Sequence, residues 1–423
     1  MRYRIAVLAG RAARRMLRLR GGGSAVPGRV MLALAPRFLE RAVSRLPLGV
    51  IFVSGSNGKS TTTNMLTGIL REHGLDVFTN PSGGNLPQGI ASAMLATVPL
   101  DGHVRGDVGV IEVDEAYGVA LAEQLKPNAV LLLNVQVDQL NRFFEPDRVV
   151  GMLKKVADAA RDLLVVNADD DSLRRVASDA SASGRAVATF GAAAELIAES
   201  PHGLANVEDF TPSTATVPTP RILVRSLDAR QATLEVDGSS MSVALPARGL
   251  HYAVDAAAAI ATALELLGER FSPESAARAM ESLRTVYGRG ETITVNGEDI
   301  EIIMMKNPPS LQLNLDYLTS HPAQVLMAVD EGTPDPSWIY DIDFSAIERV
   351  EVISGTKAWQ LATRLGYAEI PVGSVKPDLK DALAGFLALP RPQHGMKTMI
   401  VNYEQMMLIR KLLGFLDLEG GAS

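Results

Sequence analysis

The sequence predicts an α/β protein with a central domain built on a parallel sheet, a β-rich insertion in that domain, and a smaller Rossmann-like C-terminal domain. Three observations support this. A glycine-rich turn joins an apolar run to a helical pattern early in the chain. Short apolar runs that end in polar residues follow it. A second series of such runs fills the last third of the chain. Alternating strands and helices of this kind are typical of parallel sheets covered by helices.

The glycine-rich turn carries the clearest functional signal. It follows the apolar run 48–53 and precedes the helical pattern 64–71. Glycines let the backbone approach an anion, the N–H groups at the helix start face it, and Lys59 adds a positive charge. The hydroxyl of Ser60 or Thr61 is the expected Mg²⁺ ligand. A chance turn before a helix is the alternative. The residues expected to bind the phosphates of ATP are Gly55, Ser56, Asn57, Gly58, Lys59, Ser60 and Thr61.

The remaining apolar runs divide the chain into domains. From Gly184 to about Pro246 the sequence is rich in Ser, Thr, Pro and Val and alternates at 232–238, which predicts an antiparallel insertion. We assign residues 47–295 to a central ATP-binding domain and 296–423 to the C-terminal domain. The expected strands are 108–113, 129–134, 163–167, 300–305, 324–329, 350–353 and 398–401.

Composition narrows the class of protein. A chain of 423 residues with 47% hydrophobic and 21% charged residues suits two or three globular domains. The net charge of −7 argues against nucleic acid as the main partner. No apolar run reaches about 18 residues, so we expect no membrane span, and ATP chemistry without a signal peptide indicates the cytoplasm. The absence of cysteine excludes disulfides, thiolate metal sites and a cysteine nucleophile.

Residues 1–46 form a basic helical lead-in. They contain eleven arginines against the single acid Glu40, a net charge of +10. Two interpretations stay open. The segment packs as an ordinary helical lead-in on the first domain, or it presents a basic amphipathic face to anionic lipid.

The order of several further motifs resembles the Mur ligases, which use ATP to join an amine to a carboxylate. These motifs are an acidic cluster at 112–116 and polar segments at 134–142, 166–170, 249–255 and 287–291. Segments 80–90, 306–308, 335–344 and 353–358 narrow the resemblance to the MurT subunits of lipid II isoglutaminyl synthases. The resemblance covers residues 45–410.

The resemblance implies a reaction in peptidoglycan biosynthesis. ATP phosphorylates the α-carboxylate of D-isoglutamate in lipid II, and ammonia converts the acyl phosphate to D-isoglutamine. Such chemistry requires Mg²⁺ and a site sheltered from water.

The resemblance also assigns roles to residues. Glu112 matches the Mg²⁺-binding glutamate, with Glu115 as the second candidate. Arg289 matches an arginine that reaches the ATP phosphates, and Asp255 stands where an asparagine usually contacts adenine. Asp335 matches the aspartate associated with amine chemistry, and it competes with two neighbours for the catalytic role, Asp341 and Asp343.

The missing cysteine bears on the source of ammonia. A chain without cysteine cannot supply the nucleophile of a glutaminase, so amidation would require a partner subunit, a GatD-type glutaminase. The partners implied are therefore this glutaminase and lipid II at the inner face of the membrane. The zinc ribbon common in MurT proteins is excluded, so no zinc is expected. Gln139, Asn141 and Asp255 depart from the usual Mur pattern.

Two other functions remain open. One is a Mur-type ligase that adds an amino acid, as folylpolyglutamate synthase and the stem-peptide ligases do. The other is a nucleotide-binding scaffold without catalysis. Gln139 and the segment around Asp335 argue against the first, whereas Lys59, Ser60, Glu112 and Arg289 argue against the second.

Overall fold

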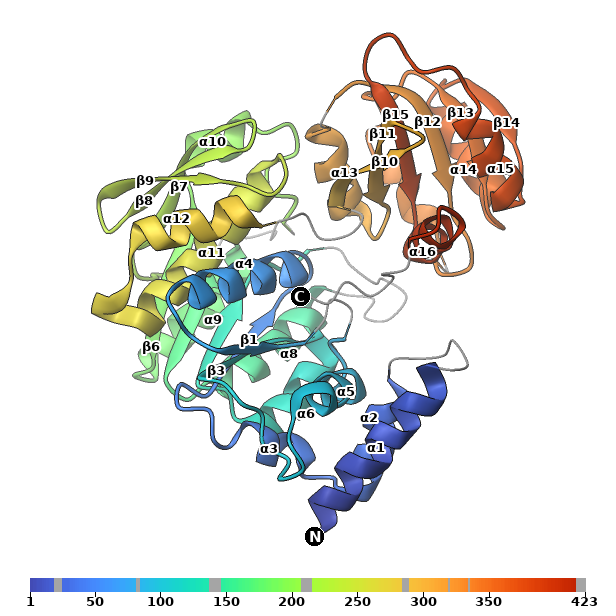
Figure 1. The fold of residues 1–423 in the computed structure, drawn as a ribbon. Helices are drawn as coiled ribbons and strands as arrows, with labels where there is room; N and C mark the ends of the chain where they lie inside the picture. The colour runs from blue at the N-terminus through green and yellow to red at the C-terminus, as the bar shows by residue number, and fades with distance from the viewer. Residues whose placement is uncertain are drawn as a thin grey trace.

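The chain forms two α/β units, each organised around one sheet (Figure 1). The computed structural model describes residues 1–18, 25–80, 84–136, 146–206, 215–283, 289–318, 320–333 and 335–415. The larger unit carries the glycine-rich turn. The smaller unit follows it in the chain and turns helix α13 (Pro308–Asp316) toward the larger one (Figure 1).

The central domain contains a nine-stranded sheet with the order β2-β3-β1-β4-β5-β6-β7-β8-β9. Strand β1 lies in its parallel part, where Val53 pairs with Glu112 of β3 and Leu131 of β4. The strand ends of β1, β3 and β4 therefore meet at one edge of the sheet. The strands are β1 (Val50–Ser54), β2 (Val77–Thr79), β3 (Val108–Glu112), β4 (Ala129–Leu132), β5 (Leu163–Asn167), β6 (Ala186–Ala192), β7 (Ile222–Asp228), β8 (Gln231–Val236) and β9 (Ser239–Ala244).

Alternating side chains of β1 divide the core into two layers. Ile51 and Val53 point into one cluster with α4, α11 and α12, whereas Val50 and Phe52 point into a second cluster with the remaining major helices. All four are at most 1% exposed. The helices are α1 (Arg2–Arg18), α2 (Val26–Leu34), α3 (Phe38–Val43), α4 (Lys59–Glu72), α5 (Pro87–Thr97), α6 (Glu115–Leu125), α8 (Pro146–Asp158), α9 (Asp171–Ala182), α10 (Ala194–Glu199), α11 (Leu250–Leu267), the 3-10 turn η1 (Gly268–Arg270) and α12 (Pro273–Ser282).

The expected β-rich insertion extends the central sheet. Strand β6 pairs in parallel with β5, and β7 pairs in parallel with β6. Only β7, β8 and β9 form an antiparallel meander, and it continues the same sheet. The reason is burial: alternating side chains of this meander, among them Val224 and Leu234, join the cluster beneath α11.

The C-terminal domain contains a six-stranded sheet with the order β10-β11-β15-β12-β13-β14, parallel except for the β10–β11 hairpin. Two apolar clusters cover its faces, one under α13 and α14 and one under α15 and α16. Its elements are β10 (Arg289–Val295), β11 (Glu298–Met304), α13, β12 (Pro322–Ala328), η2 (Ser337–Asp341), β13 (Val350–Ser354), α14 (Ala358–Tyr367), β14 (Val372–Val375), α15 (Leu379–Leu387), β15 (Met396–Val401) and α16 (Tyr403–Leu412).

Strand β10 shifts the domain boundary predicted from the sequence. We placed residues up to 295 in the central domain, but β10 pairs with β11 from Val295 back to Arg289. Asn296 and Gly297 both have positive φ angles, 52° and 78°. Such a two-residue turn joins neighbouring antiparallel strands, so the hairpin draws β10 into the C-terminal sheet.

Helix α11 is the central helix of the first core layer. Together with η1 it is the one helix among the described residues that is long and apolar enough to cross a membrane. However, 83% of its apolar window is buried inside the protein. A core helix meets the same test of length and hydropathy, and this burial is what a core helix shows.

Candidate ATP and magnesium site

The glycine-rich turn links β1 to α4, as predicted. Gly58, the residue before α4, has a φ of 83°, a conformation that glycine adopts without strain. A Cβ atom at this position would also overlap the carboxylate of Asp255 on α11. The turn therefore needs glycine at residue 58 for two reasons, backbone conformation and the close approach of α11.

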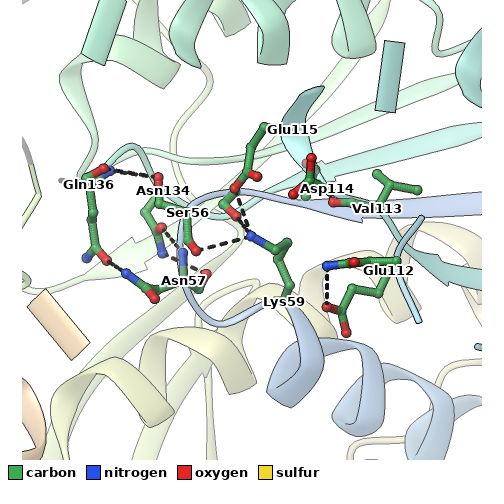
Figure 2. Close-up of polar contacts among 12 residues, drawn as sticks. Ser56, Asn57, Lys59, Glu112, Val113, Asp114, Glu115, Asn134 and Gln136 are labelled. Carbon is green, nitrogen blue, oxygen red and sulfur yellow. Dashed lines mark hydrogen bonds and ion pairs between the residues drawn. The ribbon is translucent and has the colours of Figure 1, made fainter. Parts of the chain in front are cut away.

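Lys59 and Ser60 each contact a predicted acidic residue, and Figure 2 shows the contact between Lys59 and Glu115. Lys59 Nζ forms a buried ion pair with Glu115 Oε1 at 2.7 Å and donates to the carbonyl oxygens of Gly55 and Ser56. Ser60 Oγ donates to Glu112 Oε2 at 2.7 Å. Both glutamates are at most 4% exposed. The structure thus brings together the lysine, the hydroxyl and both carboxylates that the sequence indicated.

These oxygen atoms suit Mg²⁺ in their chemistry. Ser60 Oγ and Glu112 Oε2 are hard ligands, and Glu115 Oε2 is buried without a hydrogen-bond partner. Asn85 Nδ2 lies 3.4 Å from the other oxygen of Glu112 and orients it. Within the described residues no group of three His, Asp or Glu side chains could hold a metal by itself. Since Mg²⁺ usually keeps several waters and shares phosphate oxygens, two or three protein ligands are sufficient.

Polar residues after β4 hold the turn from the other side. Asn134 Oδ1 accepts from the N–H of Asn57 at 2.9 Å, and Asn134 Nδ2 donates back to the carbonyl oxygen of Asn57. Gln136 Oε1 accepts from Asn57 Nδ2 at 2.7 Å. The sequence marked this segment only as part of a motif. The position of polar residues directly after an apolar strand was the signal for their role.

The C-terminal domain contacts the same turn. Lys306 Nζ donates to the carbonyl oxygen of Ser56 at 3.2 Å and to Asn57 Oδ1 at 3.3 Å. Asn307 Nδ2 donates to Asn57 Oδ1 at 3.0 Å, and Asn307 Oδ1 caps α13 by accepting from the N–H of Ser310. A second contact joins His202 to Asp316 at 2.9 Å. The glycine-rich turn is therefore also a point of contact between the domains.

A cleft opens between the two domains beside Asn57, Gly58 and Thr61. It encloses about 780 Å³, including solvent at its mouth. Asp255, which we predicted to contact the nucleotide, lies in its wall. Lys59, Ser60 and Glu112 are not among its lining residues, since they lie buried behind the turn. The other walls come from His251 and Tyr252 of α11, Phe190 of β6, Lys306, and Ser310, Leu313 and Asn314 of α13.

Both domains match known protein families. Residues 53–263 match the Mur ligase middle domain, and residues 304–406 match the MurT ligase C-terminal domain. The chain belongs to the Mur ligase family. It is 24% identical to the lipid II isoglutaminyl synthase subunit MurT of Streptococcus pneumoniae, with 88% of each chain covered. It is 25% identical to the same subunit of Staphylococcus aureus strain COL, over 83% of this chain and 84% of that one.

Solved structures show the Mur ligase fold. MurF from Acinetobacter baumannii superposes with a TM-score of 0.68 at 18% identity, covering 93% of this chain and 81% of that one. Folylpolyglutamate synthase from Mycobacterium tuberculosis, solved with ADP and AMPPCP, gives a TM-score of 0.63 at 15% identity, covering 92% and 98%. The α/β class with two parallel-dominated sheets is confirmed.

In this Mur ligase the predicted catalytic acids lie outside the cleft. Asp335 lies two residues before η2 in the C-terminal domain, Asp341 is the last residue of η2, and both are exposed. The backbone N–H of Ser337, 2.9 Å from Asp335 Oδ1, lowers the pKa of Asp335 below its usual value. Arg289 begins β10, but the position of its side chain is not among the described features. Gln139 and Asn141 lie outside the described residues.

Proposed function

We propose that this Mur ligase is the synthetase subunit of a lipid II amidating enzyme. It converts the D-isoglutamate α-carboxylate of the lipid II stem peptide to the D-isoglutamine amide, at the cytoplasmic face of the membrane. The observation that carries the proposal is the match of residues 304–406 to the MurT ligase C-terminal domain, joined to a Mur ligase middle domain. The similarity to two MurT subunits over more than four-fifths of the chain supports it.

The site supplies groups for each step. A carboxylate oxygen of the substrate attacks the γ-phosphorus of ATP, forming an acyl phosphate and releasing ADP. Ammonia then attacks the acyl carbon, inorganic phosphate leaves, and the amide forms with loss of a proton from nitrogen. Lys59 and the N–H groups of the turn bind the phosphates, and Asp255 faces the nucleotide from α11. Ser60, Glu112 and Glu115 would hold Mg²⁺, which neutralises phosphate charge when bound.

We infer further that ammonia comes from a GatD-type glutaminase subunit. The chain has no cysteine for glutamine hydrolysis. The C-terminal domain also exposes aromatic side chains beside the predicted catalytic acids: Tyr340 is 50% exposed, Trp359 65% and Tyr367 76%. Tyr340 and Tyr367 lie 6.2 Å apart between ring centroids. Exposed Trp and Tyr are enriched at the centres of protein interfaces, so this face is the proposed docking site of the glutaminase.

The decisive experiment uses the purified chain with ATP, Mg²⁺, ammonium chloride and lipid II, followed by mass spectrometry of the stem peptide. Ammonium supplies the amine directly and bypasses the glutaminase. We expect conversion of one carboxyl group to a carboxamide, and no conversion by the Lys59→Ala variant. Addition of an amino acid in place of ammonia would identify an amino-acid ligase. No product with either amine, even with the glutaminase present, would indicate a scaffold without catalysis.

A further inference from the structure

Helix α1 presents an apolar stripe to solvent. Ile5 is 51% exposed, Leu8 54% and Met16 61%. Together with Ala12 they follow the spacing 5, 8, 12 and 16, which places them on one face of the helix. Single exposed apolar residues are common on protein surfaces. A continuous exposed apolar stripe along a 17-residue helix instead indicates a surface that binds a partner or a membrane.

Arginines border this stripe. Arg4, Arg11 and Arg15 lie at helical spacing on its flank and are exposed. Arg11 donates to the carbonyl oxygen of Val98 at 2.6 Å. Among the described residues no acidic side chain pairs with Arg4 or Arg15. On α2, Arg29 is exposed next to the exposed apolar residue Val26. The two helices lie side by side at one end of the molecule (Figure 1).

The opposite face of α1 is anchored in the protein. Ala6 and Val7 are fully buried in the second core layer, and a side chain at Gly10 would lie 2.7 Å from Leu95 of α5. Arg2 Nε donates to the carbonyl oxygen of Leu34 at 2.6 Å, which joins α1 to α2. The apolar stripe is therefore a second, outward face of α1, because the inner face already packs against the protein.

The N-terminal segment is strongly basic, whereas the remainder of the chain is acidic. Residues 1–46 carry a net charge of +10, and because the whole chain carries −7, residues 47–423 carry −17. The segment that contains α1 and α2 therefore carries the concentration of positive charge that an anionic surface would attract. A helix with an apolar stripe flanked by arginines is typical of segments that lie in the interface of an anionic bilayer.

We propose that the exposed face of α1 and α2 docks this protein on the surface of an anionic phospholipid bilayer. Ile5, Leu8 and Met16 enter the boundary between headgroups and acyl chains, while Arg4 and Arg15 bind lipid phosphates. Nucleic acid fits less well, since the apolar stripe would contact nothing on a phosphate backbone and the remainder of the chain is acidic.

Helix α5 links the docking surface to the candidate Mg²⁺ site. The N–H of Gly28 on α2 donates to Ser92 Oγ of α5 at 2.8 Å, and a side chain at Gly28 would overlap the backbone of Gln88. Helix α5 begins two residues after Asn85, which contacts Glu112. One helix thus separates the proposed membrane surface from the catalytic edge of the sheet, so docking would place that edge close to a lipid-linked substrate.

Vesicle co-sedimentation of the full chain tests this proposal. The probes are vesicles of phosphatidylcholine alone and vesicles with about one-third phosphatidylglycerol, neither containing lipid II. We expect binding to the anionic vesicles only, and weaker binding as salt screens the charges. Because no nucleotide or substrate is present, a negative result would leave the proposed ligase function standing.

Paired variants distinguish binding through this surface from nonspecific binding of the chain to vesicles. Leu8→Gln/Met16→Gln should weaken binding about tenfold or more, and Arg4→Gln/Arg15→Gln about thirtyfold. The controls Leu408→Gln/Leu412→Gln on α16 and Arg270→Gln/Arg391→Gln change exposed residues elsewhere and should bind like wild type. The proposal would be overturned if the control variants lost vesicle binding to the same extent, or if the wild-type chain did not bind the anionic vesicles. It would also be overturned if the chain bound immobilised RNA but not the vesicles.

Discussion

Lys306 Nζ, in the C-terminal domain, lies 3.2 Å from the carbonyl oxygen of Ser56 in the glycine-rich turn of the central domain. Lys306 also lines the cleft between the domains. A cation from the second domain is thus held at the turn proposed to bind phosphate, and Asn307 beside it ties Asn57 to the start of α13. Movement of the C-terminal domain would carry this positive charge toward or away from the nucleotide.

We therefore predict that Lys306→Met lowers kcat about a hundredfold, since the loss of one preorganised charge at a developing phosphate charge has an effect of that order. Lys306→Arg should recover part of the rate. The measurement is steady-state amidation together with the KM for ATP. The exposed Lys380→Met serves as a matched control. A rate loss that arises only from weaker ATP binding would argue against a role in the chemical step.

The buried Lys59–Glu115 pair leads to a second prediction. Lys59→Ala should abolish activity and also destabilise the fold by about 3 kcal/mol, because it leaves the Glu115 charge buried without a partner. Adding Glu115→Gln removes that charge, so the double variant should regain stability but not activity. Urea unfolding and the amidation assay separate the two effects. If Lys59→Ala unfolded at the same urea concentration as the wild-type chain, the ion pair with Lys59 would not be needed to keep Glu115 buried in the stable fold.

The sequence predicted well which residues meet beside the glycine-rich turn, because its signals are local. A glycine turn, a lysine and a serine lie together in the chain, and Glu112 ends a neighbouring strand, so parallel pairing alone brings them together. Contacts between domains are not local. Lys306 and Asn57 are 249 residues apart, and their meeting depends on how α13 packs against the central domain, which no short pattern encodes.

The domain limits show the same distinction. The alternation at 232–238 predicted strand β8, but whether the meander forms its own unit or extends the central sheet depends on the burial of Val224 and Leu234 under α11. Likewise, the short hairpin turn at Asn296 and Gly297 moves β10 into the second sheet. Periodicity predicts a strand, whereas its sheet is decided by tertiary packing.

Asp335→Asn should reduce amidation about a hundredfold while sparing ATP binding. Asp335 is exposed, and the N–H of Ser337 holds its pKa below the usual value, so its negative charge can attract and orient an incoming ammonium ion. The asparagine variant keeps the hydrogen bond to Ser337 but loses the charge. Amidation rates are compared with nucleotide affinity from calorimetry. Asp341→Asn, at the last residue of η2, is the parallel variant; normal amidation by Asp335→Asn would move the role to Asp341 or Asp343.

The aromatic face of the C-terminal domain yields a prediction about the partner. Trp359→Ala/Tyr367→Ala should weaken binding of the glutaminase by about a hundredfold and remove glutamine-dependent amidation. Ammonium-dependent amidation should stay at the wild-type rate, because neither side chain lines the cleft. Leu408→Gln, also exposed in this domain, is the control. Glutamine-dependent activity that survives the double variant would place the glutaminase on another surface.

The buried carboxyl group of Asp169 predicts how stability depends on pH. Burial raises its pKa to about 6 although the N–H of Ala192 donates to it at 2.7 Å. The unfolded chain has a value near 3.8. Between these values the folded state binds the proton more tightly, so this group's contribution to stability falls as pH rises from about 4 to about 6 and is constant above.

Asp169→Asn removes this titration. The free energy of unfolding of wild type relative to the variant should therefore fall by roughly 2–3 kcal/mol between pH 4 and pH 7. Urea unfolding at several pH values measures it, with the exposed Asp228→Asn as the matched control. A difference that stayed flat, or rose with pH, would mean that Asp169 is ionised throughout. In that case the hydrogen bond from Ala192 would outweigh the cost of burying the charge.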